Sequence, residues 1–393
     1  MTRVRPLLMI PGPVDVSQPV KDAEMSGLQS HLAPAFVAAF AEALKSMRDV
    51  WGAASGQPFL VAGSGTLAME LTAANLIEPG DAVLAVSTGL FGERMAAICE
   101  RHGARVEIVH APLGHTADPD AVRGALSRAT YKVVTITHVD TSTGVLVDPG
   151  PIAALAREHG ALTVLDGVCS VGGVELRQEG WEIDVAFTAS QKALAAPPGL
   201  ALLVASPRAM NAWRSRRSPV ASYYADWANW LPIMDGYESG TPSYFGTPAV
   251  TLVSALSRAL SEVVEEGMER RVTRHWVLGV ACRRALEALG IALVPAARGA
   301  CAPTLSCAYY PDGVDGKRLL QEVLRAGVVL AGGLHPEIRS RSFRIGHMGV
   351  TNGATLAATV AALEEGLAAC GHHFAAGAGV SAVNETMREL LPA

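Results

Sequence analysis

Between about residues 57 and 205, short apolar runs alternate with segments of helical length. The runs hold four to six apolar residues without polar alternation, which is typical of strands covered on both faces. The segments between them predict helices on both sides of a mostly parallel sheet. The expected strands lie at 57–63, 81–87, 105–111, 131–139, 161–166, 183–189 and 199–205. Because ligands bind at the carboxyl ends of such strands, we expect the functional residues directly after these runs.

The pattern changes after residue 205. Segment 214–247 is rich in aromatic residues, Ser, Pro and Gly, so we predict an irregular excursion there, with a solvated basic run at 214–217. Two long amphipathic helices follow, and the last hundred residues predict a smaller α+β unit. A short amphipathic segment after residue 373 is expected to dock on a surface that the sequence does not identify. The coarse plan is a large α/β domain, linking helices and a small C-terminal domain.

Composition and charge narrow the functional classes. Half of the 393 residues are apolar and the net charge is −5, which excludes a disordered chain and gives no basic surface for nucleic acid. The six cysteines form no C-x-x-C pair and the histidines have no ligand spacing, so no disulfide scaffold and no metal site are expected. The run LLMI at the N-terminus is too short for a signal-peptide core, and no apolar run approaches the ~18 residues of a membrane span. We therefore expect a soluble, cytoplasmic protein without a membrane partner.

A lysine and an aspartate carry the strongest chemical signal. Lys192 directly follows the strand expected at 183–189, among small residues where partial burial would lower its pKa toward that of a Schiff-base nucleophile. A surface lysine in a loop is the alternative. Asp166 ends the strand expected at 161–166 and could cap a helix, or could hold a pyridinium nitrogen protonated, as pyridoxal phosphate requires.

A glycine-rich turn adds a third element. Gly63, Ser64, Gly65 and Thr66 lie between an expected strand and the start of an expected helix, where free N–H groups and hydroxyls suit a phosphate dianion. Such turns also use glycine for geometry alone.

With these residues in place, the chain resembles the class V, fold-type I pyridoxal-phosphate-dependent aminotransferases, in particular the alanine–glyoxylate, serine–glyoxylate and serine–pyruvate group. The resemblance extends to about residue 370. It is carried by the segments PGPVDVS, SGT, GLFGER, THVDTSTG, LDGVCSVGG, SQKALAAPPG, SYFGTPAV and AGGLHPEIRSRSFRIGHMGVT. It implies a large, mostly parallel, seven-stranded-type sheet domain with helices on both faces and a smaller C-terminal α+β domain. The implied division is an N-terminal arm contributing to the active site (1–15), a large cofactor domain (16–250), and linking helices with the small domain (251–393).

The resemblance also implies roles for single residues. Lys192 would bind pyridoxal 5′-phosphate as a Schiff base and then move the substrate proton, while Asp166 pairs with the pyridinium nitrogen. Ser64, Gly65 and Thr66 would hold the phosphate, with a further donor from Gln191.

Further residues would contact the ring or the substrate. Phe91 occupies the position where many members place a tryptophan over the cofactor ring, and Thr141 falls near the cofactor O3′ and the substrate. Arg344 would bind the substrate carboxylate bidentately, with Gly12 closing the same pocket through its backbone.

Two residues imply a second chain. Tyr244 and Thr247 match residues that reach the phosphate of the neighbouring subunit's cofactor, which implies a homodimer with shared active sites. Packing within the excursion is the alternative.

The expected reaction moves the amino group of a small L-amino acid, alanine first, to glyoxylate, giving glycine and pyruvate by a ping-pong mechanism. A serine–glyoxylate or serine–pyruvate aminotransferase is the nearest alternative. A cysteine desulfurase shares the implied fold and lysine, but the segment AGGLHPEIRSRS lacks the mobile cysteine that it needs. Transamination of an unusual amine is a further possibility.

Overall fold

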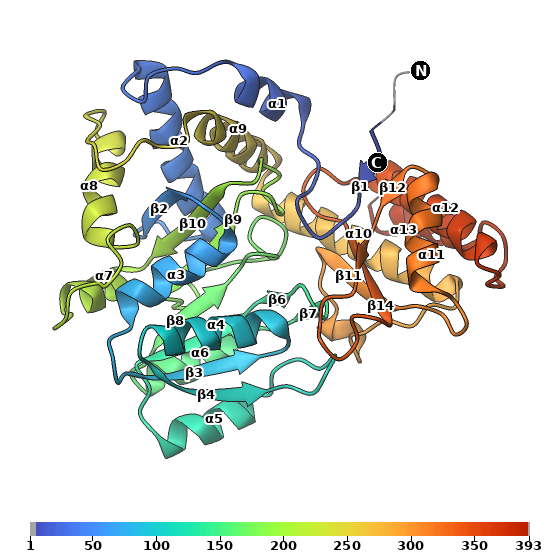
Figure 1. The fold of residues 1–393 in the computed structure, drawn as a ribbon, viewed down its shortest axis with the longest axis horizontal. Helices are drawn as coiled ribbons and strands as arrows, with labels where there is room; N and C mark the ends of the chain where they lie inside the picture. Colours follow the sequence, from blue (N-terminus) through green and yellow to red (C-terminus); the bar gives the residue numbers. More distant parts are fainter. Residues whose placement is uncertain (1–4, 392–393) are drawn as a thin grey trace.

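A seven-stranded sheet forms the centre of the larger part of the molecule. The computed structural model describes residues 5–391, and Figure 1 shows this sheet beside a smaller C-terminal unit. Its strands run in the order β2 (Gln57–Ala62), β10 (Leu200–Ala205), β9 (Val185–Ala189), β8 (Leu162–Asp166), β5 (Val133–Thr137), β3 (Ala82–Ser87) and β4 (Arg105–His110). All neighbours are parallel except β10, which is antiparallel to both β2 and β9. This confirms the predicted large, mostly parallel sheet.

Helices cover both faces of this sheet. Every residue of β5, β8, β9 and β10 is buried, which is why their sequences are mostly apolar and lack the regular polar alternation of a half-exposed strand. Several of the helices begin where the side chain of an N-cap residue, Asp118, Asp148 or Ser206, accepts a backbone N–H of the first turn. The helices of this part are α1 (Gln18–Met25), α2 (Pro34–Trp51), α3 (Gly65–Leu76), α4 (Leu90–Arg101), α5 (Pro119–Arg128), α6 (Pro149–Glu158), α7 (Pro207–Arg214), α8 (Trp227–Glu238) and α9 (Val250–Glu266).

The segment predicted as an irregular excursion contains the helix α8, so that prediction was wrong for 227–238. Asp226 caps this helix, and its residues Trp227, Trp230 and Met234 are buried at helical spacing. The internal Pro232 and the surrounding Ser, Pro and Gly concealed that spacing in the sequence.

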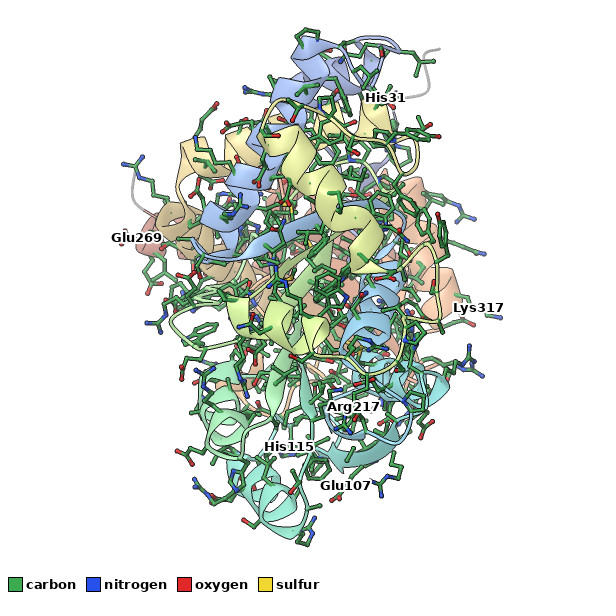
Figure 2. All side chains as sticks on the ribbon, turned by 90° about the vertical axis from the view of Figure 1, so that its left-hand side faces the viewer. His31, Glu107, His115, Arg217, Glu269 and Lys317 are labelled. Carbon is green, nitrogen blue, oxygen red and sulfur yellow. The ribbon has the colours of Figure 1, made fainter. Side chains whose placement is uncertain are left out.

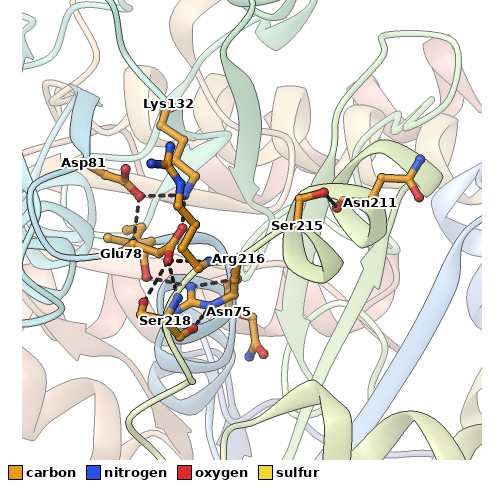
Figure 3. Close-up of polar contacts among 10 residues, drawn as sticks. Asn75, Glu78, Asp81, Lys132, Asn211, Ser215, Arg216 and Ser218 are labelled. Carbon is orange, nitrogen blue, oxygen red and sulfur yellow. Dashed lines mark hydrogen bonds and ion pairs between the residues drawn. The ribbon is translucent and has the colours of Figure 1, made fainter.

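In the basic run at 214–217, Arg214, Ser215 and Arg217 are exposed, as predicted for a solvated run, whereas Arg216 is half-buried. The Arg216 guanidinium donates to the carbonyl oxygens of Asn75 at 3.1 Å and Ile77 at 2.7 Å, at the C-terminal end of α3 (Figure 3). Burial alone would raise the pKa of Glu78, but hydrogen bonds from Ser218, Arg217 and Lys132 outweigh it and lower the pKa to about 2. These contacts fix the end of α3 that lies away from its glycine-rich start.

The C-terminal part has its own apolar core. It contains α10 (Met268–Ala288), η1 (Arg298–Ala300), α11 (Gly316–Arg325), α12 (Gly353–Ala369) and α13 (Ala378–Leu390), with a three-stranded sheet in the order β11 (Leu305–Tyr309), β14 (Ser342–Gly346) and β13 (Ala331–Gly332). The helix α13 packs against α10 and α12, so the predicted docking segment finds its surface within the chain. The helix α9 packs into the larger core and α10 into the smaller one. The predicted boundary at residue 250 stays a prediction.

The N-terminal arm joins the two parts. Its strand β1 (Leu7–Leu8) pairs in parallel with β12 (Val328–Val329) of the smaller unit. After this strand the chain crosses to the large sheet, where the Val14 N–H donates to the Gln191 carbonyl at 3.2 Å. Residues 1–4 of the predicted arm lie outside the described residues. A short hairpin, β6 (Val139–Asp140) with β7 (Val145–Leu146), lies at the carboxyl edge of the sheet.

None of the helices in the described part of the chain combines the length and the apolar character that crossing a membrane requires.

Candidate active site

Lys192 lies where the N-terminal arm meets the large sheet. It follows β9 by three positions, and its Nζ donates to the carbonyl oxygen of Pro11. The next residue, Gly12, has φ +95°, and a Cβ there would lie 2.5 Å from Lys192 Cδ and 2.8 Å from Nζ. Glycine is therefore required at position 12 both for its backbone conformation and for the close approach of the lysine. The structure thus brings Gly12 and Lys192 together, a contact that the resemblance did not imply, while the expected role of Gly12 beside Arg344 stays a prediction.

Asp166 ends the neighbouring strand β8 with one carboxylate oxygen free. Its Oδ1 accepts the Val168 N–H at 2.9 Å, while its Oδ2 is buried and has no hydrogen-bond partner among the described residues. Burial raises the pKa of Asp166 to about 7, and the nearby Asp140 carboxylate raises it further, whereas the Val168 N–H, Lys192 and Arg94 oppose this. A buried acceptor without a partner is costly, so this oxygen is suited to a cationic N–H donor from a ligand.

The start of α3 lies beside the loop that follows Asp166. A Cβ on Gly65 would lie 3.2 Å from Val168 Cγ2 and 3.4 Å from Ala189 Cβ, which brings the first turn of α3 close to both central strands. Ser64 is the N-cap residue, yet its side chain makes no capping hydrogen bond, and both Ser64 and Thr66 are exposed. The free N–H groups, the two hydroxyls and the helix dipole together suit a phosphate. Gln191 adds a buried Oε1 without a partner near Lys192.

Phe91 lies in the first turn of α4, next to residues that the sequence reasoning missed. The Arg94 guanidinium carbon lies 4.6 Å from the centroid of the Phe91 ring. The Phe91 N–H donates to Asp140 Oδ2 at 2.9 Å, and the Leu90 N–H donates to Ser142 Oγ at 3.0 Å. Asp140 and Ser142 belong to the same DTSTG segment as Thr141. The signal in the sequence that could have identified Asp140 as a site residue is its position at a strand end, directly before a turn.

Arg344 and Thr141 meet across the two parts of the molecule. Arg344, in β14, donates from Nε to the Gly332 carbonyl at 2.9 Å and from Nη1 to the Thr141 carbonyl at 3.4 Å. Burial lowers the pKa of this guanidinium, and no ion pair in the described residues involves it. A half-buried arginine without a carboxylate partner is suited to an anionic group of a ligand. The Thr141 hydroxyl lies 2.7 Å from Cys169 Sγ, a partner that the sequence did not indicate.

Tyr244 and Thr247 lie on the surface of the chain. Tyr244 is 68% exposed, and its ring centroid lies 5.9 Å from that of His31. Thr247 is exposed as well.

The residues present fit pyridoxal phosphate. The amine of Lys192, the buried Oδ2 of Asp166 and the N–H groups at the start of α3 offer partners for the aldehyde, the ring nitrogen and the phosphate of that cofactor. By contrast, the described residues contain no group of three or more His, Cys, Asp and Glu side chains that could hold a metal ion.

The comparison with known families decides the classification. The sequence profile described as Aminotransferase class-V matches residues 21–338. The chain belongs to the class-V aminotransferase family. It is a pyridoxal-phosphate-dependent aminotransferase of fold type I.

Individual class-V relatives cover nearly the whole chain. Alanine–glyoxylate aminotransferase 1 of Saccharomyces cerevisiae is 38% identical over 89% of this chain and 94% of its own length. Serine–glyoxylate aminotransferase of Arabidopsis thaliana is 31% identical over 98% of this chain and 96% of its own length. The crystal structure of pyridoxamine–pyruvate aminotransferase from Mesorhizobium loti superimposes with a TM-score of 0.92 at 29% identity, covering 99% of each chain. The chain is thus similar to aminotransferases that differ in the amino donor.

Proposed function

We propose that this aminotransferase transfers the amino group of L-alanine to glyoxylate, giving glycine and pyruvate in two half-reactions of a ping-pong cycle. The proposal rests mainly on the guanidinium of Arg344. This group is half-buried, it contacts the backbone of Thr141, and no carboxylate among the described residues pairs with it. It is supported by relatives named as glyoxylate aminotransferases, among them the Saccharomyces enzyme.

Each residue of the site has one task in this proposal. Bound pyridoxal phosphate supplies an electron sink that stabilises the negative charge left when a substrate loses its Cα proton. Lys192 Nζ would hold the cofactor and would take up and return that proton. Asp166 would keep the ring nitrogen protonated through Oδ2, and Arg344 would orient the substrate carboxylate. The arm at Pro11 and Gly12 lies against Lys192.

The surroundings of Arg344 favour a small apolar side chain. The Thr141 hydroxyl and the Cys169 thiol are paired with each other at 2.7 Å, and both residues are buried. A serine substrate would need a partner for its own hydroxyl, and leaving that hydroxyl unpaired in a buried site costs about 1–3 kcal/mol. This observation supports alanine as donor, with serine, as in the Arabidopsis relative, as the alternative.

A panel of amino donors tests this proposal. Initial rates are measured with L-alanine, L-serine, L-aspartate and pyridoxamine, each against glyoxylate and pyruvate. We expect kcat/KM with glyoxylate to be highest for alanine, and parallel double-reciprocal lines when both substrates are varied. If kcat/KM is at least tenfold higher for serine than for alanine, serine is the donor and the assignment of alanine is wrong. Intersecting double-reciprocal lines would refute the ping-pong cycle.

We also propose that two copies of the chain form a homodimer with shared active sites. Exposed apolar side chains lie in segments 25–32 and 223–244, and Figure 2 shows that His31, in the first of these segments, lies at the outer end of the molecule. The exposed Tyr224 hydroxyl donates to the Ala62 carbonyl at 3.3 Å, two residues before Ser64, and the ring of Tyr223 lies 5.5 Å from that of Phe245. The exposed members of this surface are Met25, Leu28, Leu32, Tyr223, Tyr224 and Tyr244. Such a surface supports burial against a second copy.

Subunit mixing tests whether the sites are shared. The variants Lys192→Ala and Tyr244→Ala are each expected to be inactive or strongly impaired. If Tyr244 acts on the partner's site, a mixed dimer contains one site with both residues intact, so unfolding and refolding the two variants together restores activity. If Tyr244 acts within its own chain, no intact site forms. If mass measurement detects mixed dimers but activity is not restored, the proposal that the two subunits share their active sites is refuted.

A further inference from the structure

The helix α4 receives its N-terminal capping groups from a different segment of the chain. It begins at Leu90 after Gly89, which has no side chain to accept the first N–H groups. Those acceptors come from the turn between β6 and β7: Asp140 Oδ2 accepts the Phe91 N–H and Ser142 Oγ accepts the Leu90 N–H. We propose that Asp140, together with Ser142, is a positioning residue that fixes the Phe91 ring over the cofactor.

The Asp140 carboxylate is fully used by these contacts. It is 0% exposed, and its second oxygen, Oδ1, accepts the Ser142 N–H at 2.8 Å and the Ser142 hydroxyl. Among the described residues no ion pair involves Asp140, so its charge faces backbone N–H groups and the positive end of the α4 dipole. Because the oxygens of this buried carboxylate meet only N–H and O–H donors, Asp140 acts here through its acceptor geometry.

The two segments are in direct contact over several residues. A Cβ on Gly89 would lie 2.6 Å from Ser142 Oγ and 2.7 Å from Asp140 Cγ, so only glycine fits between the helix and the turn. The Thr143 hydroxyl donates to the Thr88 carbonyl at 3.1 Å. The backbone of Phe91 is therefore held in place by its contact with the segment of Asp140 and Ser142, and not by helix propensity alone.

The Phe91 side chain is held as well. Arg94, one turn further along α4, places its guanidinium 4.6 Å from the ring centroid, which covers one face of the ring. Phe91 is half-buried and packs partly against the large core, and the proposal assigns the rest of its ring surface to a flat group such as the cofactor ring. Phenylalanine is smaller than tryptophan and overlaps less with such a ring, so its placement has to be set more closely.

The same turn reaches the substrate side of the site. Thr141, between Asp140 and Ser142, accepts the Arg344 Nη1 donor at 3.4 Å through its carbonyl oxygen. The turn therefore contacts both the proposed ring platform and the proposed carboxylate-binding arginine.

A double-mutant cycle on cofactor affinity tests the proposal, which rests on the cofactor ring lying beside Phe91. Full-length variants Asp140→Asn, Phe91→Ala and the double variant are freed of cofactor, and the Kd of pyridoxal phosphate is measured by absorbance and by circular dichroism of the bound cofactor. In Asp140→Asn the shape is kept, but one oxygen becomes an NH₂ group that cannot accept the Phe91 N–H. We expect each single variant to raise Kd at least tenfold, and Asp140→Asn to add no more than about twofold to Phe91→Ala, because coupled residues are not additive.

Independent outcomes separate the possible failures. Full additivity of the two changes would overturn a role of Asp140 through Phe91. An unchanged Kd in Phe91→Ala would overturn the placement of Phe91 on the ring and leave the proposed amino transfer untouched, since no substrate is present. Ser142→Ala, which removes the Leu90 acceptor, is expected to raise Kd less than Asp140→Asn, and serves if the latter does not fold. The matched control is Asp118→Asn, which alters the exposed cap of α5 and is expected to leave Kd unchanged within twofold.

Discussion

Replacing Asp166 by asparagine is expected to stabilise the cofactor-free protein at neutral pH while it damages the enzyme. Burial raises the pKa of this carboxyl from 3.8 to about 7, so the folded protein holds a proton there that the unfolded chain releases above pH 4. Stability from this group is therefore lost as pH rises from about 4 to 7. Three pKa units correspond to about 4 kcal/mol as an upper limit, and the part between pH 5 and 8 is about 3 kcal/mol.

The amide introduced by Asp166→Asn cannot ionise, so the difference in stability between variant and wild type must depend on pH. An unfolding entropy of roughly 2.1 cal/mol/K per residue converts about 3 kcal/mol into about 4 °C for a chain of this length. We expect the Tm of cofactor-free Asp166→Asn, relative to wild type, to rise by up to about 4 °C from pH 5 to pH 8. Thermal melts after removal of the cofactor with hydroxylamine measure this. Parallel curves over that range would mean that Asp166 is already ionised in the empty site, and would refute the reasoning.

The same substitution is expected to impair the loaded enzyme. The amide has no charge to pair with a protonated ring nitrogen, and loss of one partner of a buried ion pair costs roughly 3–5 kcal/mol. We therefore expect kcat to fall at least a hundredfold. A suitable control is Asp184→Asn, at the opposite end of β9, whose carboxylate pairs with Arg208 at 2.7 Å. This control should lower Tm without reducing kcat, and near wild-type turnover of Asp166→Asn would contradict the role of Asp166.

Three further substitutions test single contacts of the site. Lys192→Ala should abolish covalent attachment of the cofactor, measured as the mass added after borohydride reduction; attachment that persists would identify another lysine, and exposed Lys317→Ala is the control. Gly12→Ala should lower kcat at least tenfold, because its Cβ would lie within 2.8 Å of Lys192 Nζ at a φ of +95°; an unchanged kcat would show that the arm does not hold the lysine. Arg344→Gln should raise KM for the amino donor ten- to a hundredfold with a smaller change in kcat and an unchanged cofactor Kd, whereas an unchanged KM would remove Arg344 from substrate binding.

The large sheet was predictable because its strands are buried on both faces. Strands such as β5 and β9 are short runs of apolar residues bounded by polar ones, and this pattern has no helical period. The reversed direction of β10 was not predictable, because an antiparallel strand that is covered on both faces has the same composition as a parallel one. The helix α8 was missed because Pro232 and the surrounding turn residues outweighed the helical spacing of its tryptophans.

The site was predictable where chemistry is tied to the end of a strand. Lys192, Asp166 and the start of α3 follow strands directly, and the fold brings such positions to one edge. The family resemblance implied that the arm contributes to the active site, but its contact with Lys192 was not predictable, since Pro11 and Lys192 are 181 positions apart and share no local signal. The carboxylate before a turn at a strand end could have marked Asp140 as a candidate, but the capping of α4 by Asp140 and Ser142 was not predictable, because hydrogen bonds between distant segments depend on three-dimensional placement that one sequence does not specify.

The central claim is tested most directly by following the nitrogen atom. The holoenzyme is incubated with L-alanine labelled with ¹⁵N and with unlabelled glyoxylate, and the products are analysed by mass spectrometry, with the Lys192→Ala variant as control. We predict ¹⁵N-glycine and an equal amount of pyruvate with the wild type, and neither product with the variant. If the wild type forms no labelled glycine from alanine, yet does so from labelled serine or another donor, the assignment of alanine is contradicted; if no donor labels glycine, transfer to glyoxylate itself is contradicted.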